Sequence, residues 1–288
     1  MKRREFLIGS AATLASGKAW GRRDQAKLDR VAVMTLSFDP ILKSASRPAD
    51  PQRTVDIIDF ADMIAERYGI HRVEFQQTDF SSTEPGYFEE FRGRIKRAKS
   101  QVNQINLEFA NLNVSARDPV IRLEAIVLTK SWIDHAAELE CPRVMVNQGT
   151  LAPEVRQPAI EALKTMGAYA RTKGVSVTME PRWRADAVNV PWEVLVEVIK
   201  ASGTYVNPDC GNFPDNESRM AALRMMYAMT AGSSHVKHFP GKLEAAEAIR
   251  LSKELGYNGI YTIEERGYNG SDPYTGVQTV LDLLLANI

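Results

Sequence analysis

The chain has few cysteines, no excess of charge of either sign and no long apolar run. Its 288 residues include only two cysteines, too few for the disulfide framework of a small secreted domain. Lys and Arg number 36, as do Asp and Glu, so no basic excess favours nucleic acid or an anionic membrane. No segment is apolar over the roughly 20 residues that a transmembrane helix needs. The sequence therefore argues against nucleic-acid binding and against stable membrane insertion.

The N-terminal 23 residues have the pattern of a twin-arginine export signal. Arg3 and Arg4 stand in a basic region, and the weakly apolar segment 8–15 that follows is too short to span a bilayer. We therefore expect residues 1–23 to be a signal segment with an undefined cleavage position. The Tat export machinery would be its partner, and the mature protein would be periplasmic or otherwise exported. The alternative is a disordered basic tail.

Apolar runs alternate with amphipathic segments through residues 28–288, which is typical of a parallel sheet wrapped by helices. Strands are expected near residues 31–37, 70–76, 105–110, 143–147, 175–180, 204–209, 234–239 and 259–264. Helices are expected near residues 54–68, 86–101, 119–139, 153–172, 191–201, 217–230, 243–255 and 274–285. Eight strand-helix units in one domain predict the α/β class and a single (β/α)8 TIM barrel. Cys141 and Cys210 would then lie at opposite barrel ends, too far apart for a disulfide.

Four residues with metal-ligand side chains recur at the expected ends of four successive strands. Glu180, Asp209, His235 and Glu264 are separated by 29, 26 and 29 residues. One strand-helix unit of a barrel takes roughly 31 residues, so the four side chains should share one level on the face that carries the chemistry. Two glutamates, an aspartate and a histidine make a site for a divalent cation, with positions left open for substrate oxygens. The alternative, four unrelated buried polar groups, does not account for the shared period.

The residues next to these four in the sequence indicate which side chains point toward the site. Lys237 lies two residues after His235, so the two side chains point the same way. Lys237 is expected either to pair with a substrate oxygen or to compensate the carboxylates. Glu264 and Glu265 are adjacent, so only one faces the barrel axis, and the spacing favours Glu264. Gly211 is expected to let the chain turn sharply away from the end of its strand.

Glu74, Asn147 and Trp183 are further candidates for substrate binding. Glu74 lies within a predicted strand and should either approach the substrate or be paired by a basic partner, as should Glu108. Asn147 ends the fourth strand and is either a hydrogen-bond donor to a polyol or a turn former. Trp183 lies in a long loop and either stacks on a sugar ring or shields the barrel mouth.

These features together resemble the xylose isomerase-like TIM-barrel superfamily, in particular ketose 3-epimerases and hydroxypyruvate isomerase. The resemblance covers the whole barrel and rests on the segments Met179-Glu180-Pro181, Pro208-Asp-Cys-Gly-Asn-Phe213, His235-Val-Lys237 and Ile263-Glu264. It implies that Glu180, Asp209, His235 and Glu264 hold one divalent cation. Mn²⁺ is the first choice, with Mg²⁺, Co²⁺ or Zn²⁺ as alternatives.

The resemblance also implies that Glu180 and Glu264 act as the acid/base pair. Two positions depart from the pattern of ketose 3-epimerases. Asn212 stands where those enzymes carry a His, and Gly241 stands where they carry an Arg. Asn212 is retained as a candidate for substrate binding, and the resemblance leaves the identity of the sugar open.

The residues and the resemblance predict an exported, divalent-metal-dependent sugar isomerase or epimerase. Its substrate would be a small sugar or keto-sugar that loses a proton alpha to the carbonyl and passes through an enediolate. The alternative is a lyase or dehydratase acting on keto-sugars or keto-glycosides, because the same intermediate can expel a leaving group. A non-catalytic sugar-binding barrel would not need both glutamates, and phosphodiester cleavage is disfavoured by the small number of histidines. The sequence does not decide between a monomer and a homo-oligomer.

Overall fold

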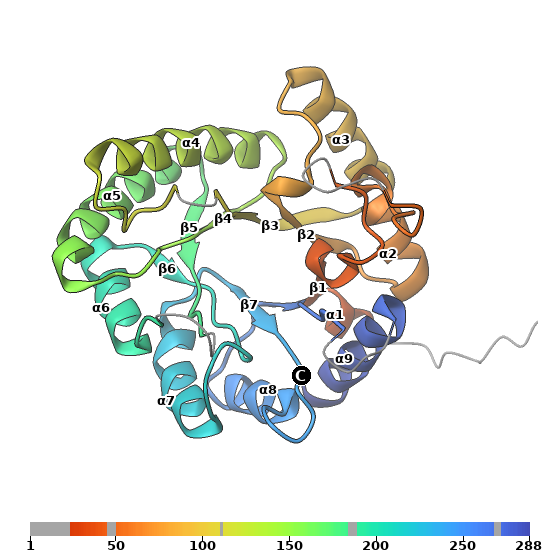
Figure 1. Ribbon diagram of the computed structural model, residues 1–288. Coiled ribbons are helices and arrows are strands. Elements are labelled where there is room, and N and C mark those ends of the chain that lie inside the picture. The colour runs from red at the N-terminus through yellow and green to blue at the C-terminus, as the bar shows by residue number, and fades with distance from the viewer. Residues whose placement is uncertain (1–23, 45–49, 110–111, 184–188, 268–271) are drawn as a thin grey trace, which may run out of the picture.

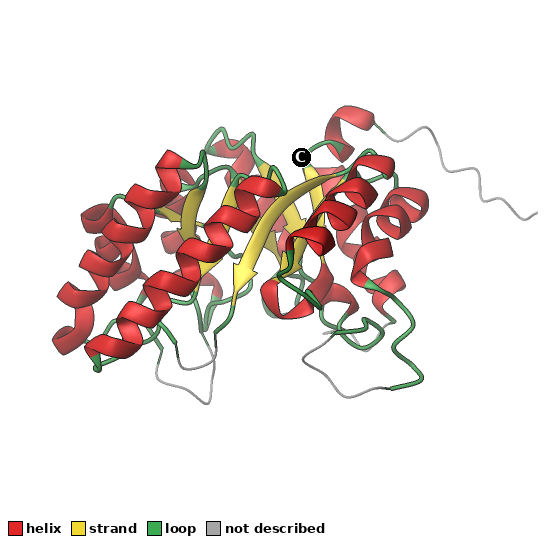
Figure 2. Ribbon diagram, turned by 90° about the horizontal axis from the view of Figure 1, so that it is seen from above, coloured by secondary structure: helices red, strands yellow, loops and turns green. Residues whose placement is uncertain are grey.

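Eight parallel strands form the centre of the molecule and helices surround them (Figures 1 and 2). The computed structural model describes residues 24–44, 50–109, 112–183, 189–267 and 272–288, so the predicted export segment 1–23 lies outside the described residues. The order of the strands in the sheet is β6-β5-β4-β3-β2-β1-β8-β7. The strands are β1 (Val31–Met34), β2 (Arg72–Gln76), β3 (Gln101–Leu107), β4 (Arg143–Val146), β5 (Ser176–Met179), β6 (Tyr205–Val206), β7 (Ser233–Val236) and β8 (Ile260–Ile263).

Helices follow the strands in the alternation that the sequence predicts. They are α1 (Gln25–Leu28), α2 (Phe60–Tyr68), α3 (Pro85–Arg97), α4 (Pro119–Glu138), α5 (Pro153–Thr172), α6 (Trp192–Ser202), α7 (Asn216–Met226), α8 (Ala245–Glu254) and α9 (Pro273–Asn287). Short 3-10 turns span Thr35–Phe38, Ile57–Asp59, Gln77–Asp79 and Tyr227–Met229. Together these elements make a (β/α)8 TIM barrel, as predicted. Among the described residues, no helix is long and apolar enough to cross a membrane.

Apolar side chains fill the layer between the strands and the helices, whereas polar side chains occupy the barrel interior. In the outer layer, Phe75 of β2 packs edge to face against Phe91 of α3, with ring centroids 5.1 Å apart. In the interior, hydrogen bonds join strands that are not neighbours in the sheet. Asn103 Nδ2 of β3 donates to Ser233 Oγ of β7 and Thr262 Oγ1 of β8, at 3.0 Å each. The interior is therefore a hydrogen-bonded polar core that leads up to the face where the strands end.

The barrel closes between β6 and β7 through very few backbone contacts. Isolated bridges connect β6 and β7 with the residues that flank them, Val206 to Thr230 and Asp209 to His235. The His235 N–H donates to Pro208 O at 2.8 Å, and the Cys210 N–H donates to His235 O at 3.1 Å. Two of the predicted metal ligands therefore face each other across this closing seam.

The third strand is the main point at which the predicted fold was wrong. It was expected at residues 105–110, but β3 begins four residues earlier, at Gln101. The polar residues Asn103 and Gln104 hid its first half, because such side chains are uncommon in strands buried on both faces. They are tolerated here because they form hydrogen bonds inside the barrel.

Candidate metal centre

The ends of four parallel strands bring Glu180, Asp209, His235 and Glu264 together. Glu180 directly follows β5, Glu264 directly follows β8, and His235 lies in β7. The Glu264 N–H donates to Val236 O at 3.1 Å, which holds the end of β8 beside β7. Each of the four residues offers one ligand atom, and these atoms all lie within 4.8 Å of one another. The structure therefore gathers all four predicted ligands at one point.

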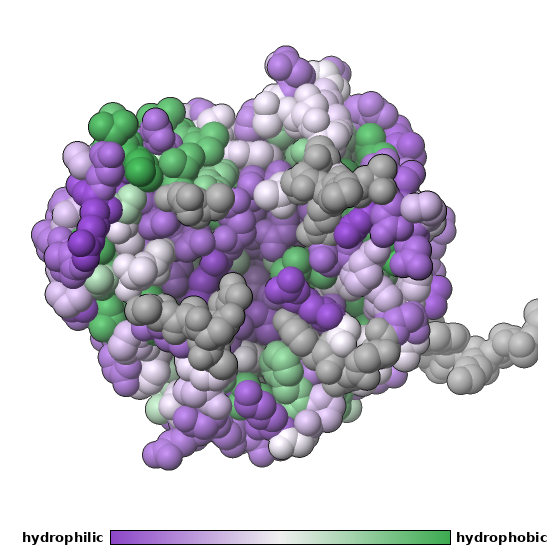
Figure 3. All heavy atoms as spheres, in the orientation of Figure 1, coloured by the Kyte–Doolittle hydropathy of each residue, from purple (hydrophilic) through white to green (hydrophobic). Residues whose placement is uncertain are grey.

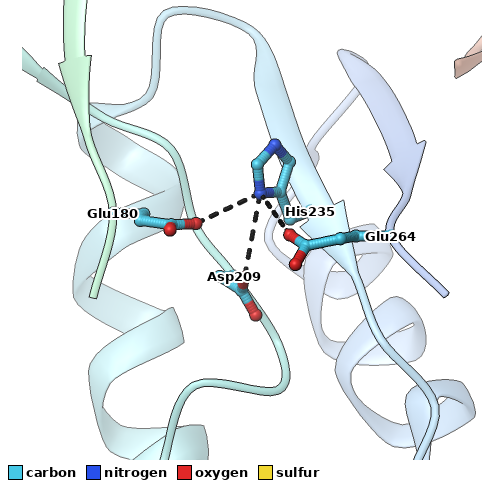
Figure 4. Close-up of side chains that lie close together, drawn as sticks. All are labelled: Glu180, Asp209, His235 and Glu264. Carbon is cyan, nitrogen blue, oxygen red and sulfur yellow. Dashed lines mark hydrogen bonds and ion pairs between the residues drawn. The ribbon is translucent and has the colours of Figure 1, made fainter. Parts of the chain in front are cut away.

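The imidazole of His235 lies at the centre of this group (Figure 4). Its Nδ1 is 3.1 Å from Glu180 Oε2, 3.1 Å from Glu264 Oε2 and 3.8 Å from Asp209 Oδ2. All four side chains are buried. One imidazole nitrogen and three carboxylate oxygens are a donor set that suits a divalent cation such as Mn²⁺, Mg²⁺ or Zn²⁺. The cluster can therefore hold a metal ion, and its chemistry leaves the choice among these ions open.

Two basic side chains approach the carboxylates from the cavity side. Lys237 Nζ lies 2.7 Å from Asp209 Oδ2 and 3.0 Å from Glu264 Oε1. Arg182 Nε lies 3.5 Å from Glu180 Oε1, and the same guanidinium pairs with Glu108. Each glutamate of the cluster thus directs one oxygen toward His235 and the other toward a basic group. Such a pattern holds the carboxylates in place at a buried position.

The electrostatic environment shifts the pKa values of the group in different directions. Burial is the largest influence on the Glu180 carboxyl and raises its pKa, although His235 and Lys237 oppose the shift. Burial acts the same way on Asp209, but Lys237 and His235 outweigh it and hold the pKa of this carboxyl well below its usual range. Burial would lower the pKa of His235, but the surrounding carboxylates, Glu74 foremost, raise it well above its usual value. In the metal-free protein, burial thus makes the carboxyl of Glu180 more easily protonated than that of Asp209.

A cavity of about 720 Å³ opens above the cluster. Glu180, Glu264, Lys237, Asn212 and Trp183 line it, as do the apolar side chains of Met34, Phe213 and Phe239. Figure 3 shows the hollow at the centre of this face, with mainly hydrophilic residues at its base. Across the cavity mouth, Lys242 Nζ stands 5.5 Å from the centroid of the Trp183 ring. Three of the five predicted substrate-binding residues, Lys237, Asn212 and Trp183, therefore face a space that a small molecule can enter.

The other two predicted substrate-binding residues lie elsewhere. Glu74 of β2 is not among the lining residues; it is fully buried beneath His235, with Oε1 2.6 Å from Nε2 of the imidazole. Asn147 also does not line the cavity, and its Nδ2 donates to Glu108 Oε2 at 3.0 Å. Both side chains are engaged by protein groups, so the expectation of direct substrate contact is corrected for each. The pairing of Glu74 with a basic partner, the other alternative, is what the structure shows.

The remaining local predictions can be compared directly with the structure. Glu264 points into the cluster, whereas Glu265 is fully buried away from it and its N–H donates to Ser37 Oγ at 3.0 Å. Cys141 and Cys210 are both free, as expected. Gly211 is required for close approach: a Cβ there would lie 2.6 Å from Cβ of Lys237. The glycine thus allows the chain after β6 to pass tightly against β7.

Sequence reasoning missed Arg182, which contacts two glutamates and lines the cavity. Its burial lowers the pKa of the guanidinium, but Glu180 and Glu108 outweigh this effect and raise it. The signal in the sequence was its position two residues after Glu180, in the loop that leaves β5. Gln76 and Arg266 also line the cavity and were not predicted.

The sequence comparisons agree with this geometry. The family model described as "Xylose isomerase-like TIM barrel" matches residues 63–286, which is most of the chain. The protein belongs to this family. The predicted resemblance is thereby confirmed at the level of the family. A search of curated proteins gave no match to the chain.

Several solved structures share the fold of this xylose isomerase-like barrel. The D-psicose 3-epimerase of Clostridium cellulolyticum H10 with D-tagatose has a TM-score of 0.68 at 14% identity, over 90% of this chain and 96% of that one. The D-allulose 3-epimerase of Methylomonas sp. has a TM-score of 0.69 at 13% identity, over 90% of this chain and 98% of that one. A xylose isomerase-like TIM barrel protein of Mycobacterium smegmatis in complex with magnesium has a TM-score of 0.64 at 19% identity, over 91% of this chain and 98% of that one. At these identities the likeness shows the fold.

Proposed function

We propose that this xylose isomerase-like protein is a metal-dependent isomerase or epimerase of a keto-sugar. The observation that carries the proposal is the placement of Glu180 and Glu264 on two sides of one buried His-carboxylate cluster, both facing the cavity. The structural neighbours described as D-psicose and D-allulose 3-epimerases support a sugar substrate. A cation held by Glu180, Asp209, His235 and Glu264 would supply Lewis-acid stabilisation of charge that develops on substrate oxygens.

The two glutamates are suited to move the proton. Glu180 and Glu264 reach the floor of the cavity from β5 and β8, which lie on different sides of the cluster. One carboxylate would remove the proton alpha to the carbonyl, and the other would return a proton to the opposite face or to the neighbouring carbon. The first outcome inverts the centre and the second isomerises the sugar. The carboxylate that removes the proton must hold it until the second step.

Other cavity residues would bind and orient the sugar. Lys237 and Asn212 line the cavity, where Lys237 Nζ donates to Asn212 Oδ1 at 3.0 Å. A sugar hydroxyl would bind there by replacing this contact. The indole of Trp183 forms one wall, against which the apolar face of a sugar ring can pack. The substrate would thus be held by polar groups at the reacting end and by an aromatic surface beside it.

The test is exchange of substrate hydrogen with solvent in D₂O, measured with a panel of keto-sugars and Mn²⁺-loaded protein. Glu180→Gln and Glu264→Gln should each slow exchange by at least about 10²-fold, because a placed carboxylate contributes about 10²–10⁴ to a proton transfer. Glu161→Gln, the same change on the exposed surface of α5, should leave exchange unaltered. Undiminished exchange in both active-site variants contradicts the proposed roles. Mass spectrometry of the products separates epimerisation from elimination, since a lyase gives an unsaturated product or a released aglycone.

Metal content decides between an enzyme and a sugar-binding barrel. Elemental analysis of protein purified without chelators should show close to one divalent ion per chain, with Mn²⁺ our first choice and Mg²⁺, Co²⁺ or Zn²⁺ as alternatives. Asp209→Asn should lower that content, because the carboxylate is one of the four proposed ligands. Near-zero occupancy in the wild type would favour a non-catalytic barrel.

We also propose that the protein is exported through the twin-arginine route. The support is the paired Arg3 and Arg4 in the basic N-terminal region. Replacement of both residues by Lys should retain the protein in the cytoplasm, as measured by cell fractionation and immunoblotting. An unchanged distribution of the double variant would contradict the proposal.

A further inference from the structure

The two ring nitrogens of His235 face different chemical surroundings. Nδ1 faces the cluster, 3.1 Å from oxygens of both Glu180 and Glu264. Nε2 points away from the three carboxylates, as Figure 4 shows, and lies 2.6 Å from Glu74 Oε1. His235 and Glu74 are both fully buried. Glu74 therefore contacts the proposed metal ligand from behind, where no substrate can reach it.

The carboxylate of Glu74 is held in place by several donors besides His235. These are Asn103 Nδ2 at 3.2 Å, Gln104 Nε2 at 3.1 Å, Asn106 Nδ2 at 2.8 Å and Thr262 Oγ1 at 2.9 Å. An ionised carboxylate accepts hydrogen bonds and donates none. The short contact therefore places a hydrogen of His235 on Nε2, so Nδ1 is the nitrogen that gives up its hydrogen when a cation binds among the three carboxylates.

A bulge in β3 makes this arrangement possible. Val73 pairs with Val102, but Glu74 pairs with Gln104, so Asn103 is the extra residue. In a regular strand adjacent side chains point to opposite faces, whereas a bulge changes the direction of the side chains at its position. Asn103 and Gln104 consequently both reach the same carboxylate. The irregularity sits beside Glu74, the glutamate that contacts His235 through Nε2.

The position of Asn103 is in turn fixed from the opposite end of the barrel. Arg143 Nη1 donates to Asn103 Oδ1 at 3.0 Å and to Asn103 O at 2.9 Å. This contact orients the amide so that its Nδ2 faces Glu74. A continuous set of hydrogen bonds thus runs from Arg143 through Asn103 and Glu74 to His235.

We propose that Glu74 is a positioning residue that holds His235 in the tautomer and orientation required for metal binding. The proposal rests on the metal site of the proposed function and adds a residue that acts only through the ligand. Hydrogen-bond partners of this kind orient the histidine ligands of metal sites, and their loss typically costs about 10–100-fold in metal affinity.

Two substitutions at Glu74 test its contribution to metal affinity in two steps. Glu74→Gln keeps the volume and an acceptor oxygen but removes the charge, whereas Glu74→Met removes the acceptor altogether. Titration of EDTA-stripped protein with Mn²⁺ should give a dissociation constant about 10–100-fold higher for Glu74→Met, with Glu74→Gln in between. Ser252→Ala is the matched control. It removes another buried hydrogen bond, between Ser252 Oγ and the Tyr261 hydroxyl at 2.6 Å, without touching Glu74 or His235, and should bind Mn²⁺ as the wild type does.

A spectroscopic measurement separates positioning from a structural role. The chain has four histidines, so ¹H–¹⁵N spectra of the Mg²⁺-loaded protein can resolve the Nε2–H signal of His235. We expect this proton to be shifted downfield and protected from exchange with solvent in the wild type and in Ser252→Ala, because it is hydrogen-bonded to Glu74, and to lose both properties in Glu74→Met. Wild-type affinity and a wild-type Nε2–H signal in both folded Glu74 variants would overturn the proposal. If Glu74→Met does not fold, Glu74→Gln decides by the same criteria. Failure of the wild type itself to bind metal would overturn the proposed function and this inference together.

Discussion

Removal of the Lys237 ammonium should destabilise the metal-free protein strongly. The side chain is 5% exposed, and its Nζ lies 2.7 Å from Asp209 Oδ2 and 3.0 Å from Glu264 Oε1. Lys237→Met keeps an apolar stem of similar length but leaves these buried carboxylates without that cation. Loss of one partner from a buried ion pair costs about 3–5 kcal/mol. For a domain of this size the midpoint of thermal unfolding should fall on the order of 10 °C.

The loss should be smaller when the site is filled. A bound dication supplies compensating charge to the same carboxylates, so the variant should gain more stability from metal than the wild type does. Urea unfolding of the wild type and of Lys237→Met measures the difference in their free energies of unfolding, once in EDTA and once in saturating Mn²⁺. Lys242→Met is the matched control: Lys242 is exposed beside Trp183, and its loss should cost at most about 1 kcal/mol in either condition. An equal loss for Lys237→Met with and without Mn²⁺ would refute the reasoning.

Three further predictions concern packing, thiols and metal removal. Gly211→Ala should destabilise the protein by about 1–3 kcal/mol and weaken Mn²⁺ binding, because its Cβ would lie 2.6 Å from Lys237 Cβ. Calorimetry measures the loss of stability, and titration with Mn²⁺ measures the loss of affinity. Burial raises the pKa of Cys141 to about 12 and of Cys210 to about 11. Since the thiolate is the reactive form, a disulfide reagent at pH 8 should detect no thiol in the folded protein and two in guanidinium. Chelation of the metal should speed amide hydrogen exchange at Cys210 and His235 more than in β2 and β3, as mass spectrometry can measure; equal protection would contradict this.

The positions of the proposed metal ligands could be predicted because, in a parallel barrel, the separation of two residues in the sequence indicates their relative position along the barrel axis. Each strand-helix unit returns the chain to the same face of the barrel. Residues that are one unit apart in the sequence therefore lie at the same level along the barrel axis. Glu180 and Glu264 directly follow β5 and β8, and His235 lies in β7. The same logic distinguished Glu264 from Glu265, since adjacent residues at a strand end point in opposite directions. These predictions required only the strand positions and their order.

Contacts across the barrel interior could not be predicted in this way. The partner of Glu74 is His235, 161 residues further along the chain, and strand patterns alone do not show which interior residues meet. The bulge at Asn103 also breaks the alternation on which such patterns depend. Arg182 presents a different difficulty, because its approach to Glu180 is set by the path of a loop. Interior pairing and loop conformation thus account for the two main omissions, Glu74 as a partner of His235 and Arg182 as a cavity residue.

The location of the metal centre at the closing seam links binding to the integrity of the barrel. Between β6 and β7 the backbone contributes few hydrogen bonds, two of which flank the bridge that joins Asp209 to His235. A cation held by these two side chains would connect the edges of the sheet at the point where backbone pairing is weakest. Glu180 on β5 and Glu264 beside β8 extend the connection one strand further on each side. The ion would therefore serve both as the centre of the proposed chemistry and as the cross-link that holds strands β5 to β8 in register.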